Sequence, residues 1–234
     1  ENRRLKYIGP KDLGGLAIDS FCERCFWFER HFGPFPMRFP GIFNVLDNVS
    51  KKSVYRSLMN RKKLPDWLEL ENVEKRMALE EIGTVESFMN RKFLVASHPK
   101  SGWILRGGPD AVFQLKDKTI HIVDFKTARF SPKQDELFPM YEIQLNGYAL
   151  LIQKFPISKL SLIYCEPATD LKDDTEFNLS FSTKVVNVDL KPQIIPPLLI
   201  QAREIVAQKT PPQAKDGCRG VCFYIDKIVS ENNL

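Results

Sequence analysis

The hydrophobic and polar positions of this 234-residue chain change their period near residue 92. Before that point, apolar residues recur at helical spacing in residues 21–28 and 42–58. Beyond it, apolar and β-branched residues gather in short runs typical of strands. These runs are residues 92–98, 102–115 and 119–128. The pattern predicts a mainly helical N-terminal part, residues 1–91, followed by strands.

The rest of the chain alternates between helical and strand-like patterns. We expect a helix within residues 135–155, strands at 159–168 and 184–190, and a helix opened by prolines within 194–212. The acidic stretch 66–90 is predicted as partly helical. This order is typical of an α/β fold. We interpret residues 1–234 as a single domain, with residues 92–234 forming the core and a cysteine-containing C-terminal tail.

Composition adds few restrictions. The chain is 43% hydrophobic and 27% charged, so it can bury a core. Its net charge of +5 permits an anionic partner without requiring one. No apolar run approaches the ~20 residues of a membrane helix, and we expect no membrane partner. The chain contains five cysteines, and an odd number is not typical of the disulfide framework of a secreted protein. We therefore expect an intracellular, cytoplasmic protein. The chain begins at Glu1 rather than Met, which leaves a removed leader peptide open.

The run TIHIVDFKTA carries two charges that a buried strand does not need. Residues two apart on a strand face the same side, so Asp124 and Lys126 point the same way. A hairpin can bring them close to Asp110, which follows the bend signal Gly107-Gly108-Pro109. Neighbouring carboxylates repel unless they share a cation, and oxygen ligands favour Mg²⁺ or Mn²⁺. The pattern predicts a metal-dependent site that cleaves phosphodiesters, with the lysine orienting water or stabilising charge on the phosphate.

The motifs GGPD, DFK and QLNGY, in this order, resemble the PD-(D/E)XK nuclease superfamily, in the branch of RecB-type nuclease domains and CRISPR-adaptation nucleases. The resemblance implies a restriction-endonuclease-like core, with a mixed central sheet flanked by helices. It implies that Asp110 and Asp124 bind the divalent metal and that Lys126 is catalytic. It also implies that Gln144 and Tyr148, one helical turn apart, support the site and contact DNA. A surface amide and a core aromatic are the alternative interpretations of this last pair.

The same branch commonly has a further metal ligand, a His or Glu, on an upstream helix. The predicted helix over residues 42–58 contains no histidine. Asp47 is the best substitute, followed by Asn44 and then by Glu80 or Glu81. The backbone carbonyl of Phe125 is a further candidate ligand.

Four of the cysteines form two close pairs at the two ends of the chain, Cys22 with Cys25 and Cys218 with Cys222. Four thiolates can close a tetrahedral Zn²⁺ site or hold a [4Fe–4S] cluster. The resemblance favours an iron–sulfur cluster that joins the two ends, although related clusters usually draw one cysteine from the N-terminal side and three from the C-terminal side. A Zn²⁺ site, or cysteines that are buried on a helix face without any metal, are the alternative interpretations. We interpret Cys165 as a core strand residue.

A nuclease needs basic side chains for the phosphate backbone. The basic stretch after residue 50 supplies the candidates Lys51, Lys52, Arg56, Lys62 and Lys63. An ordinary solvated helix face is the alternative interpretation.

These observations predict a divalent-metal-dependent deoxyribonuclease. The resemblance favours exonuclease action on DNA that is single-stranded or has free ends. A non-catalytic nucleic-acid-binding module of the same fold is one alternative. A protein whose four-cysteine zinc or iron–sulfur site is its main function is another. Repair, CRISPR adaptation and mobile-element processing are all compatible with the sequence.

Overall fold

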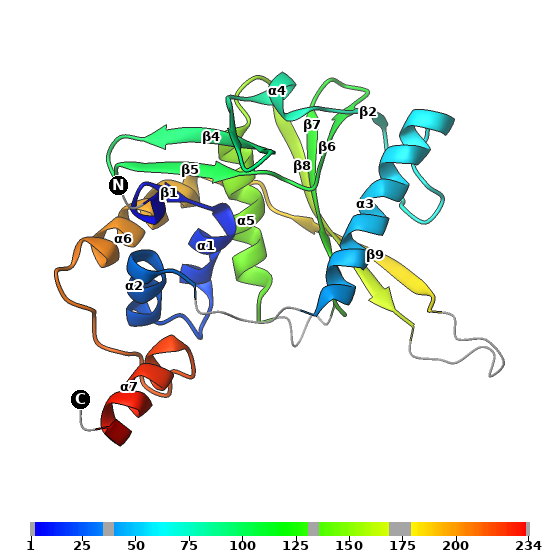
Figure 1. Ribbon diagram of the computed structural model, residues 1–234. Helices are drawn as coiled ribbons and strands as arrows, with labels where there is room; N and C mark the ends of the chain where they lie inside the picture. Colours follow the sequence, from blue (N-terminus) through cyan, green and yellow to red (C-terminus); the bar gives the residue numbers. More distant parts are fainter. Residues whose placement is uncertain (1–2, 35–39, 131–135, 169–178, 233–234) are drawn as a thin grey trace.

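The computed structural model describes residues 3–34, 40–130, 136–168 and 179–232. It confirms the predicted α/β class, with two mixed sheets flanked by helices (Figure 1). The sheets have four and five strands. Among the described residues, no helix combines the length and apolar character needed to cross a membrane.

The five-stranded sheet contains the strands predicted to carry the site. In spatial order it consists of β2 (Val73–Arg76), β6 (Ala111–Leu115), β7 (Ile120–Lys126), β8 (Ile157–Pro167) and β9 (Phe181–Val188). Strands β6 and β7 form the expected antiparallel hairpin, and β7 pairs in parallel with β8. Parallel neighbours require a crossover, which α5 (Phe138–Leu151) provides.

Successive side chains of β7 alternate between two hydrophobic clusters. Ile120 and Ile122 are buried in the larger cluster, which includes residues of α5. Val123 and Phe125 are buried in a smaller cluster with Val54 of α3 (Gly41–Arg61). Because strand side chains alternate with a period of two, the positions after Ile122 on its face are 124 and 126. The alternation therefore directs the two charged residues toward the α5 side.

The four-stranded sheet lies beside α5 on the side away from α3 (Figure 1). Its order is β1 (Tyr7–Ile8), β5 (Trp103–Gly107), β4 (Arg91–His98) and β3 (Val85–Phe88). The run 102–115, predicted as one strand with a bend, passes from this sheet into the other at the Gly-Gly-Pro bend. Gly107 fits closely there, since a Cβ on it would lie 2.7 Å from Cε1 of Tyr148.

The N-terminal part contains helices and also contributes strands to both sheets. The helices are η1 (Arg3–Leu5), α1 (Pro10–Gly14), η2 (Gly15–Ala17), α2 (Glu23–Phe32), α3 and α4 (Leu79–Ile82). The acidic stretch 66–90 holds β2, the four-residue helix α4 and β3, so it is less helical than its sequence predicted. Strands β1, β2 and β3 gain their stability from pairing with distant strands, which local sequence patterns do not report.

The C-terminal part returns to the N-terminal helices. It comprises η3 (Pro192–Ile194), α6 (Ile195–Ala207) and α7 (Val221–Asn232). Arg24 of α2 forms an ion pair with Asp226 of α7, with 2.9 Å between Nη2 and Oδ1. Segments about 200 residues apart in the chain are thus neighbours in space (Figure 1).

Candidate active site

The open end of the β6–β7 hairpin brings the two predicted acidic residues together. Paired positions end at Ala111 opposite Val123, so the N–H of Phe125 has no partner on β6. The Oδ2 of Asp110 accepts this N–H at 2.9 Å. In a strand, the N–H and C=O of one residue point to the same side, so the Phe125 carbonyl also faces Asp110. The hairpin therefore assembles a carboxylate and a carbonyl at one edge.

Lys126 and Asp124 are in direct contact on the next part of β7. The Nζ of Lys126 lies 2.6 Å from Oδ2 of Asp124. Both side chains are nearly buried, with exposed fractions of 11% and 5%. The same ammonium lies 4.0 Å from the centre of the Tyr141 ring, a cation–π distance. The alternation rule that predicted their common face is confirmed by this geometry.

Helix α5 supplies a buried amide that connects the site residues. Gln144 accepts a hydrogen bond from Lys126 Nζ at 2.9 Å through its Oε1. Its Nε2 donates to Asp124 Oδ1 at 3.2 Å and to the Tyr148 hydroxyl at 2.9 Å. Of the predicted pair, Gln144 thus contacts both charged residues of β7, and Tyr148 contacts Gln144. Tyr141, one turn earlier on α5, was missed by the sequence analysis, although its spacing from Gln144 places it on the same helix face.

Burial strongly perturbs the ionisation of this cluster. It raises the pKa of Asp124 to about 6, with the Asp110 charge adding to the rise and Lys126 opposing it. Burial also raises the pKa of the Tyr148 phenol, and the charge of Asp124 adds to the effect. A buried carboxylate with a raised pKa gains much from an added cation, which is typical of a metal or catalytic position.

Helix α3 brings Asp47 to the same centre through a lysine. The Nζ of Lys51 lies 2.7 Å from Oδ2 of Asp47 and 2.6 Å from Oδ1 of Asp110. Burial alone would lower the pKa of Lys51, but the charges and hydrogen bonds of the two aspartates raise it. Lys51, predicted to contact DNA, therefore points toward the acidic residues. This bridging role was not visible in the sequence, because it depends on how α3 packs against the hairpin.

The other candidates for the upstream ligand have different partners. The backbone carbonyl of Asn44 accepts a hydrogen bond from Asn48. Glu80 forms an ion pair with Lys92. Glu81 accepts the N–H of Ala78 at the start of α4. Of the four candidates, Asp47 is the one joined to Asp110, through the shared ammonium.

The donors at this centre suit a hard divalent cation. Two carboxylates and a carbonyl oxygen are the ligand types that Mg²⁺ and Mn²⁺ prefer. Each carboxylate already has a lysine ammonium at 2.6 Å, so a metal ion would have to compete with these ammonium groups for the carboxylate oxygens. A cavity of about 200 Å³ adjoins Asp110 and Phe125, and its lining also includes Lys51, Tyr55 and Arg76. There is room beside the acidic edge for a bound group.

The four predicted metal-binding cysteines converge at the other end of the molecule. The sulfurs of Cys22, Cys25, Cys218 and Cys222 all lie within 4.8 Å of one another. Among the described residues, they form the only such group of three or more Cys, His, Asp or Glu ligand atoms. The closest pairs are 3.2 Å (Cys218–Cys222) and 3.3 Å (Cys25–Cys222). None of the four forms a disulfide.

The chemistry of these thiols fits a bound metal. Burial and neighbouring thiols raise the pKa of Cys222, and burial raises the pKa of Cys25 to about 11. A metal ion binds cysteines as thiolates, so metal binding here would release protons from these thiols. Cys165 lies half-buried on β8 against the smaller hydrophobic cluster, as its core interpretation predicted.

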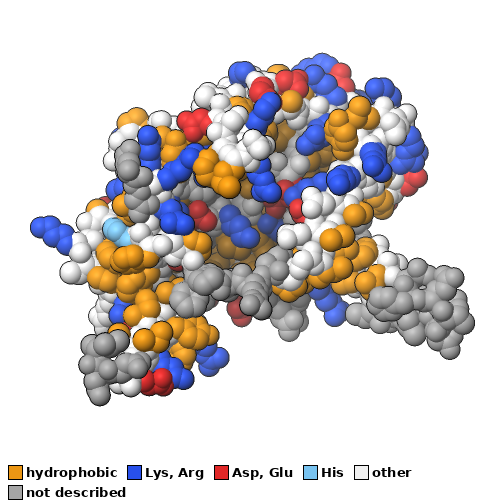
Figure 2. All heavy atoms as spheres, in the orientation of Figure 1, with side chains coloured by type: hydrophobic (Ala, Val, Ile, Leu, Met, Phe, Trp, Pro, Cys, Tyr) orange, Lys and Arg blue, Asp and Glu red, His pale blue; other side chains and the backbone are white. Residues whose placement is uncertain are grey.

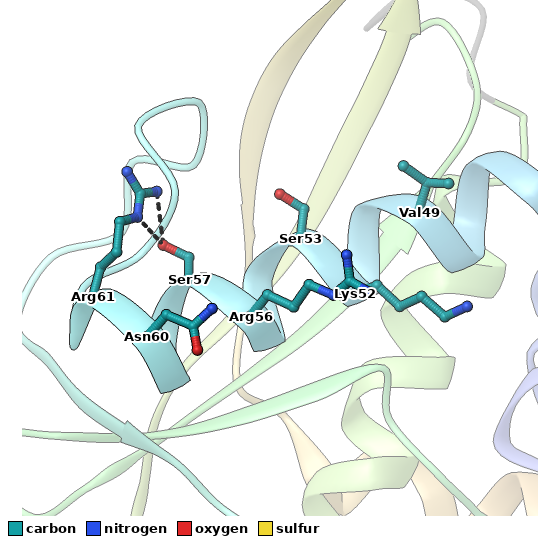
Figure 3. Close-up of a pocket in the computed structure, with 7 residues that line it drawn as sticks. All are labelled: Val49, Lys52, Ser53, Arg56, Ser57, Asn60 and Arg61. Carbon is teal, nitrogen blue, oxygen red and sulfur yellow. Dashed lines mark hydrogen bonds between the residues drawn. The ribbon is translucent and has the colours of Figure 1, made fainter.

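The remaining basic candidates lie on α3 or directly after its last residue, and they do not share one position. Lys52 and Arg56 line a pocket of about 430 Å³ along the helix (Figure 3). In the same pocket Arg61 donates two hydrogen bonds to the Ser57 hydroxyl (Figure 3). Figure 2 shows Lys and Arg side chains gathered over α3 and the adjoining strands.

The two lysines at the end of α3 are in different surroundings. Lys62 ends the helix in a left-handed conformation, with φ of 55°. Lys63 forms an exposed ion pair with Asp66 at 3.0 Å. These positions leave Lys52 and Arg56 as the predicted pair that shares an open basic face.

Comparisons with known proteins agree with the motifs. The model of the PD-(D/E)XK nuclease superfamily matches residues 42–226. A solved structure, described as the crystal structure of SSO0001, is similar with a TM-score of 0.41 and 16% identity, over 88% of this chain and 78% of that chain. A search of curated protein sequences finds no match.

Proposed function

The chain belongs to the PD-(D/E)XK nuclease superfamily, and from this membership we propose that it is a divalent-metal-dependent deoxyribonuclease centred on Asp110, Asp124 and Lys126. The observation that carries the proposal is the direct contact between Lys126 and the buried carboxylate of Asp124. A non-catalytic module would not need a buried acid with a raised pKa beside a buried lysine. The helical N-terminal part and the core act in this proposal as one nuclease domain.

Asp110, Asp124 and the carbonyl of Phe125 would hold the metal. The carboxylates of Asp47, Asp110 and Asp124 do not all lie within 4.8 Å of one another, so Asp47 would have to leave Lys51 and move closer to become a fourth protein ligand. A divalent ion there would polarise the scissile phosphate and lower the pKa of a bound water. Lys126 offers N–H donors beside Asp124, where its ammonium orients the attacking water or stabilises negative charge on the phosphate. Its low exposure strengthens this electrostatic effect.

Gln144 and Tyr148 are positioning residues in this scheme. The amide of Gln144 binds Lys126 and Asp124 simultaneously, so it fixes the distance between the ammonium and the carboxylate. The hydroxyl of Tyr148 accepts the second N–H of the amide, which fixes the amide orientation. Such fixed geometry matters because small displacements of catalytic groups greatly reduce reaction rates.

We propose DNA with single-stranded or free ends as the substrate, and exonuclease action in the RecB-like branch. The open face of Lys52 and Arg56 on α3 supports backbone contacts outside the catalytic centre. The cavity beside Asp110 accommodates the group next to the scissile phosphate.

Digestion of end-labelled single- and double-stranded DNA with Mn²⁺ tests the function. The wild-type chain should degrade DNA, and Lys126→Ala should be slower by at least about 10²-fold. Lys118→Ala is the matched control, since Lys118 is exposed at the far turn of the hairpin, where it pairs with Glu74. Equal rates for the wild type and Lys126→Ala, or no cleavage by either, would favour the non-catalytic module.

We further propose that the four cysteines hold a metal that joins α2 to the C-terminal segment. A tetrahedral ion with bonds of about 2.3 Å keeps its sulfurs about 3.8 Å apart. The shortest sulfur separations here, 3.2–3.7 Å, support this geometry. In a [4Fe–4S] cluster each cysteine binds a different iron, which requires a wider set of sulfurs. We therefore favour Zn²⁺ in a structural role.

A further inference from the structure

A pocket of about 620 Å³ lies over one face of the four-stranded sheet, and residues of all four strands line it together with residues of η1, α1 and α2. Its lining includes four arginines, Arg3, Arg4, Arg30 and Arg106. Three aromatic residues, Tyr7, Phe88 and Phe93, complete much of its wall. None of these residues belongs to the acidic centre or to the basic face of α3. The pocket therefore needs an explanation of its own.

Arg106 is held against the aromatic wall with an unused donor. Its guanidinium carbon lies 4.8 Å from the ring centre of Tyr7 and 5.1 Å from those of Phe88 and Phe93. Its Nη1 is buried and has no hydrogen-bond partner among the described residues. A buried donor without an acceptor is costly, and an anionic oxygen would satisfy it.

Arg3 contributes a second available cation. Its guanidinium lies over the Phe88 ring at 3.7 Å and near the Tyr7 ring at 5.0 Å. Neither Arg3 nor Arg106 forms an ion pair within the described part of the chain.

The acidic groups that line the pocket do not neutralise Arg3 and Arg106. Asp12 pairs with the buried Arg30, with 3.3 Å between Oδ2 and Nη1. Burial raises the pKa of Glu29, and the charge of Asp12 adds to this rise, so Glu29 offsets less of the positive charge. The pocket thus keeps an excess of positive charge at Arg3 and Arg106.

The pocket and the acidic centre share a wall. Gly107 follows Arg106, and a Cβ on it would lie 2.7 Å from Cε1 of Tyr148 and 3.0 Å from Cδ of Pro10. Asp12, which lines the pocket, is close enough to Tyr148 for its charge to contribute to the raised pKa of the phenol. Four residues of chain lead from Arg106 to Asp110, a reach of at most about 14 Å. A nucleic-acid strand needs few nucleotides to cover that distance.

We propose that this pocket binds a phosphate and the adjoining base of a single-stranded nucleic acid, a few nucleotides from the scissile bond. The inference rests on the proposed nuclease function. Guanidinium groups bind phosphate oxygens in bidentate fashion, and their planes also stack on bases. Arginines combined with aromatic rings are typical of surfaces that bind single strands, whose bases are free to stack.

Binding to a nuclease-inactive protein tests the pocket separately from cleavage. In the Lys126→Ala background, fluorescence anisotropy would measure the affinity for a labelled oligothymidine of about 12 nucleotides. Arg106→Ala and Arg3→Ala should each weaken binding roughly tenfold and reduce the salt dependence by about one phosphate contact. Lys118→Ala removes one positive charge at the far turn of the hairpin, and it should change neither the affinity nor its salt dependence.

These measurements distinguish a single-strand site from the other ligands that the pocket could bind. Affinities for Arg106→Ala and Arg3→Ala equal to that for Lys118→Ala would overturn the proposal. Equally tight binding of thymidine monophosphate would assign the pocket to free nucleotides, and a preference for blunt duplex would assign it to paired DNA; either refutes the proposal. Arg3 is exposed, so its variant stays informative if Arg106→Ala misfolds. Loss of binding in the pocket variants without cleavage by the wild type would refute the nuclease function and leave the pocket standing.

Discussion

The Nζ of Lys51 lies 2.6 Å from Oδ1 of Asp110, so α3 places an ammonium against a carboxylate of the proposed metal site. The ammonium of Lys51 would repel a divalent ion at Asp110, and the ammonium and the ion would compete for the Oδ1 of Asp110. We expect Lys51→Met to tighten Mn²⁺ binding on the order of tenfold, measured by calorimetric titration without DNA.

Lys63→Met is the control for this change, because Lys63 lies beyond the end of α3 and pairs with Asp66. It should leave the Mn²⁺ affinity unaltered. Weaker Mn²⁺ binding by Lys51→Met would show instead that Lys51 holds Asp110 and Asp47 in place for the metal.

At the proposed metal site, the buried carboxyl of Asp124 should make metal binding depend on pH. Its pKa is raised to about 6, so the group is protonated below that pH and must lose its proton to bind a metal. The Mn²⁺ affinity should therefore fall about tenfold for each pH unit below about 6 and become constant above it. Titrations between about pH 5 and 7.5 would measure this, and a flat profile would contradict it.

The same shift affects folding in the opposite sense. The folded metal-free protein binds this proton more tightly than the unfolded chain does. Its free energy of unfolding should therefore fall as the pH rises from the ordinary carboxyl pKa of 3.8 to about 6. Asp124→Asn should remove this contribution, which urea unfolding of the two proteins at matched pH would detect.

Gln144→Leu should reduce both activity and stability. It removes the partner of Lys126 and of Tyr148 in a buried region, which costs about 1–3 kcal/mol. Displacement of the ammonium should lower kcat by about 10²-fold. Tyr148→Phe removes a single hydroxyl, and we expect a loss nearer 1 kcal/mol. Urea unfolding and steady-state cleavage would measure both; Gln153→Leu, at an exposed position after α5, is the matched control.

If the four clustered cysteines hold the proposed metal, replacement of any of them should release it. Cys25→Ser removes a sulfur that lies 3.3 Å from Cys222 and 3.5 Å from Cys218. We expect loss of the metal in elemental analysis and a lower thermal midpoint. Cys165→Ser, on β8, should retain the metal. An unchanged metal content in Cys25→Ser would show that the cluster is only a packed group of thiols, and brown colour with visible absorbance would favour iron–sulfur over zinc.

The acidic centre followed from local rules, whereas its surroundings did not. Strand alternation placed Asp124 and Lys126 on one face, and hairpin pairing placed Asp110 beside them, because both rules act within about twenty residues. The contact between Lys51 and Asp110 joins a helix to a hairpin about sixty residues away, and local periodicity carries no information on such packing. Strand β1 has two residues and forms by pairing with β5, so its sequence carries little strand signal.

The periodicity of apolar residues also did not predict how exposed α3 is. Its apolar residues recur at helical spacing, yet Ile42, Val45 and Val49 are more than half exposed, and Val54 is buried. The helix contacts the sheet mainly through its C-terminal half, since the smaller hydrophobic cluster lies beneath Val54 and Leu58. A periodic pattern indicates a helix, but the neighbouring elements decide how much of it is covered.

The joining of Cys25 to Cys218, 193 residues later, sets an order of events during protein synthesis. At about 5–20 residues per second, a ribosome needs about 10 to 40 seconds to add the intervening chain. The strands of both sheets are made by the end of that interval, whereas Cys22 and Cys25 have no cysteine partners until Cys218 and Cys222 are added. The cysteine cluster can therefore close only after the C-terminal segment has been made, and a protein without the proposed metal would lack that link between α2 and the C-terminal segment.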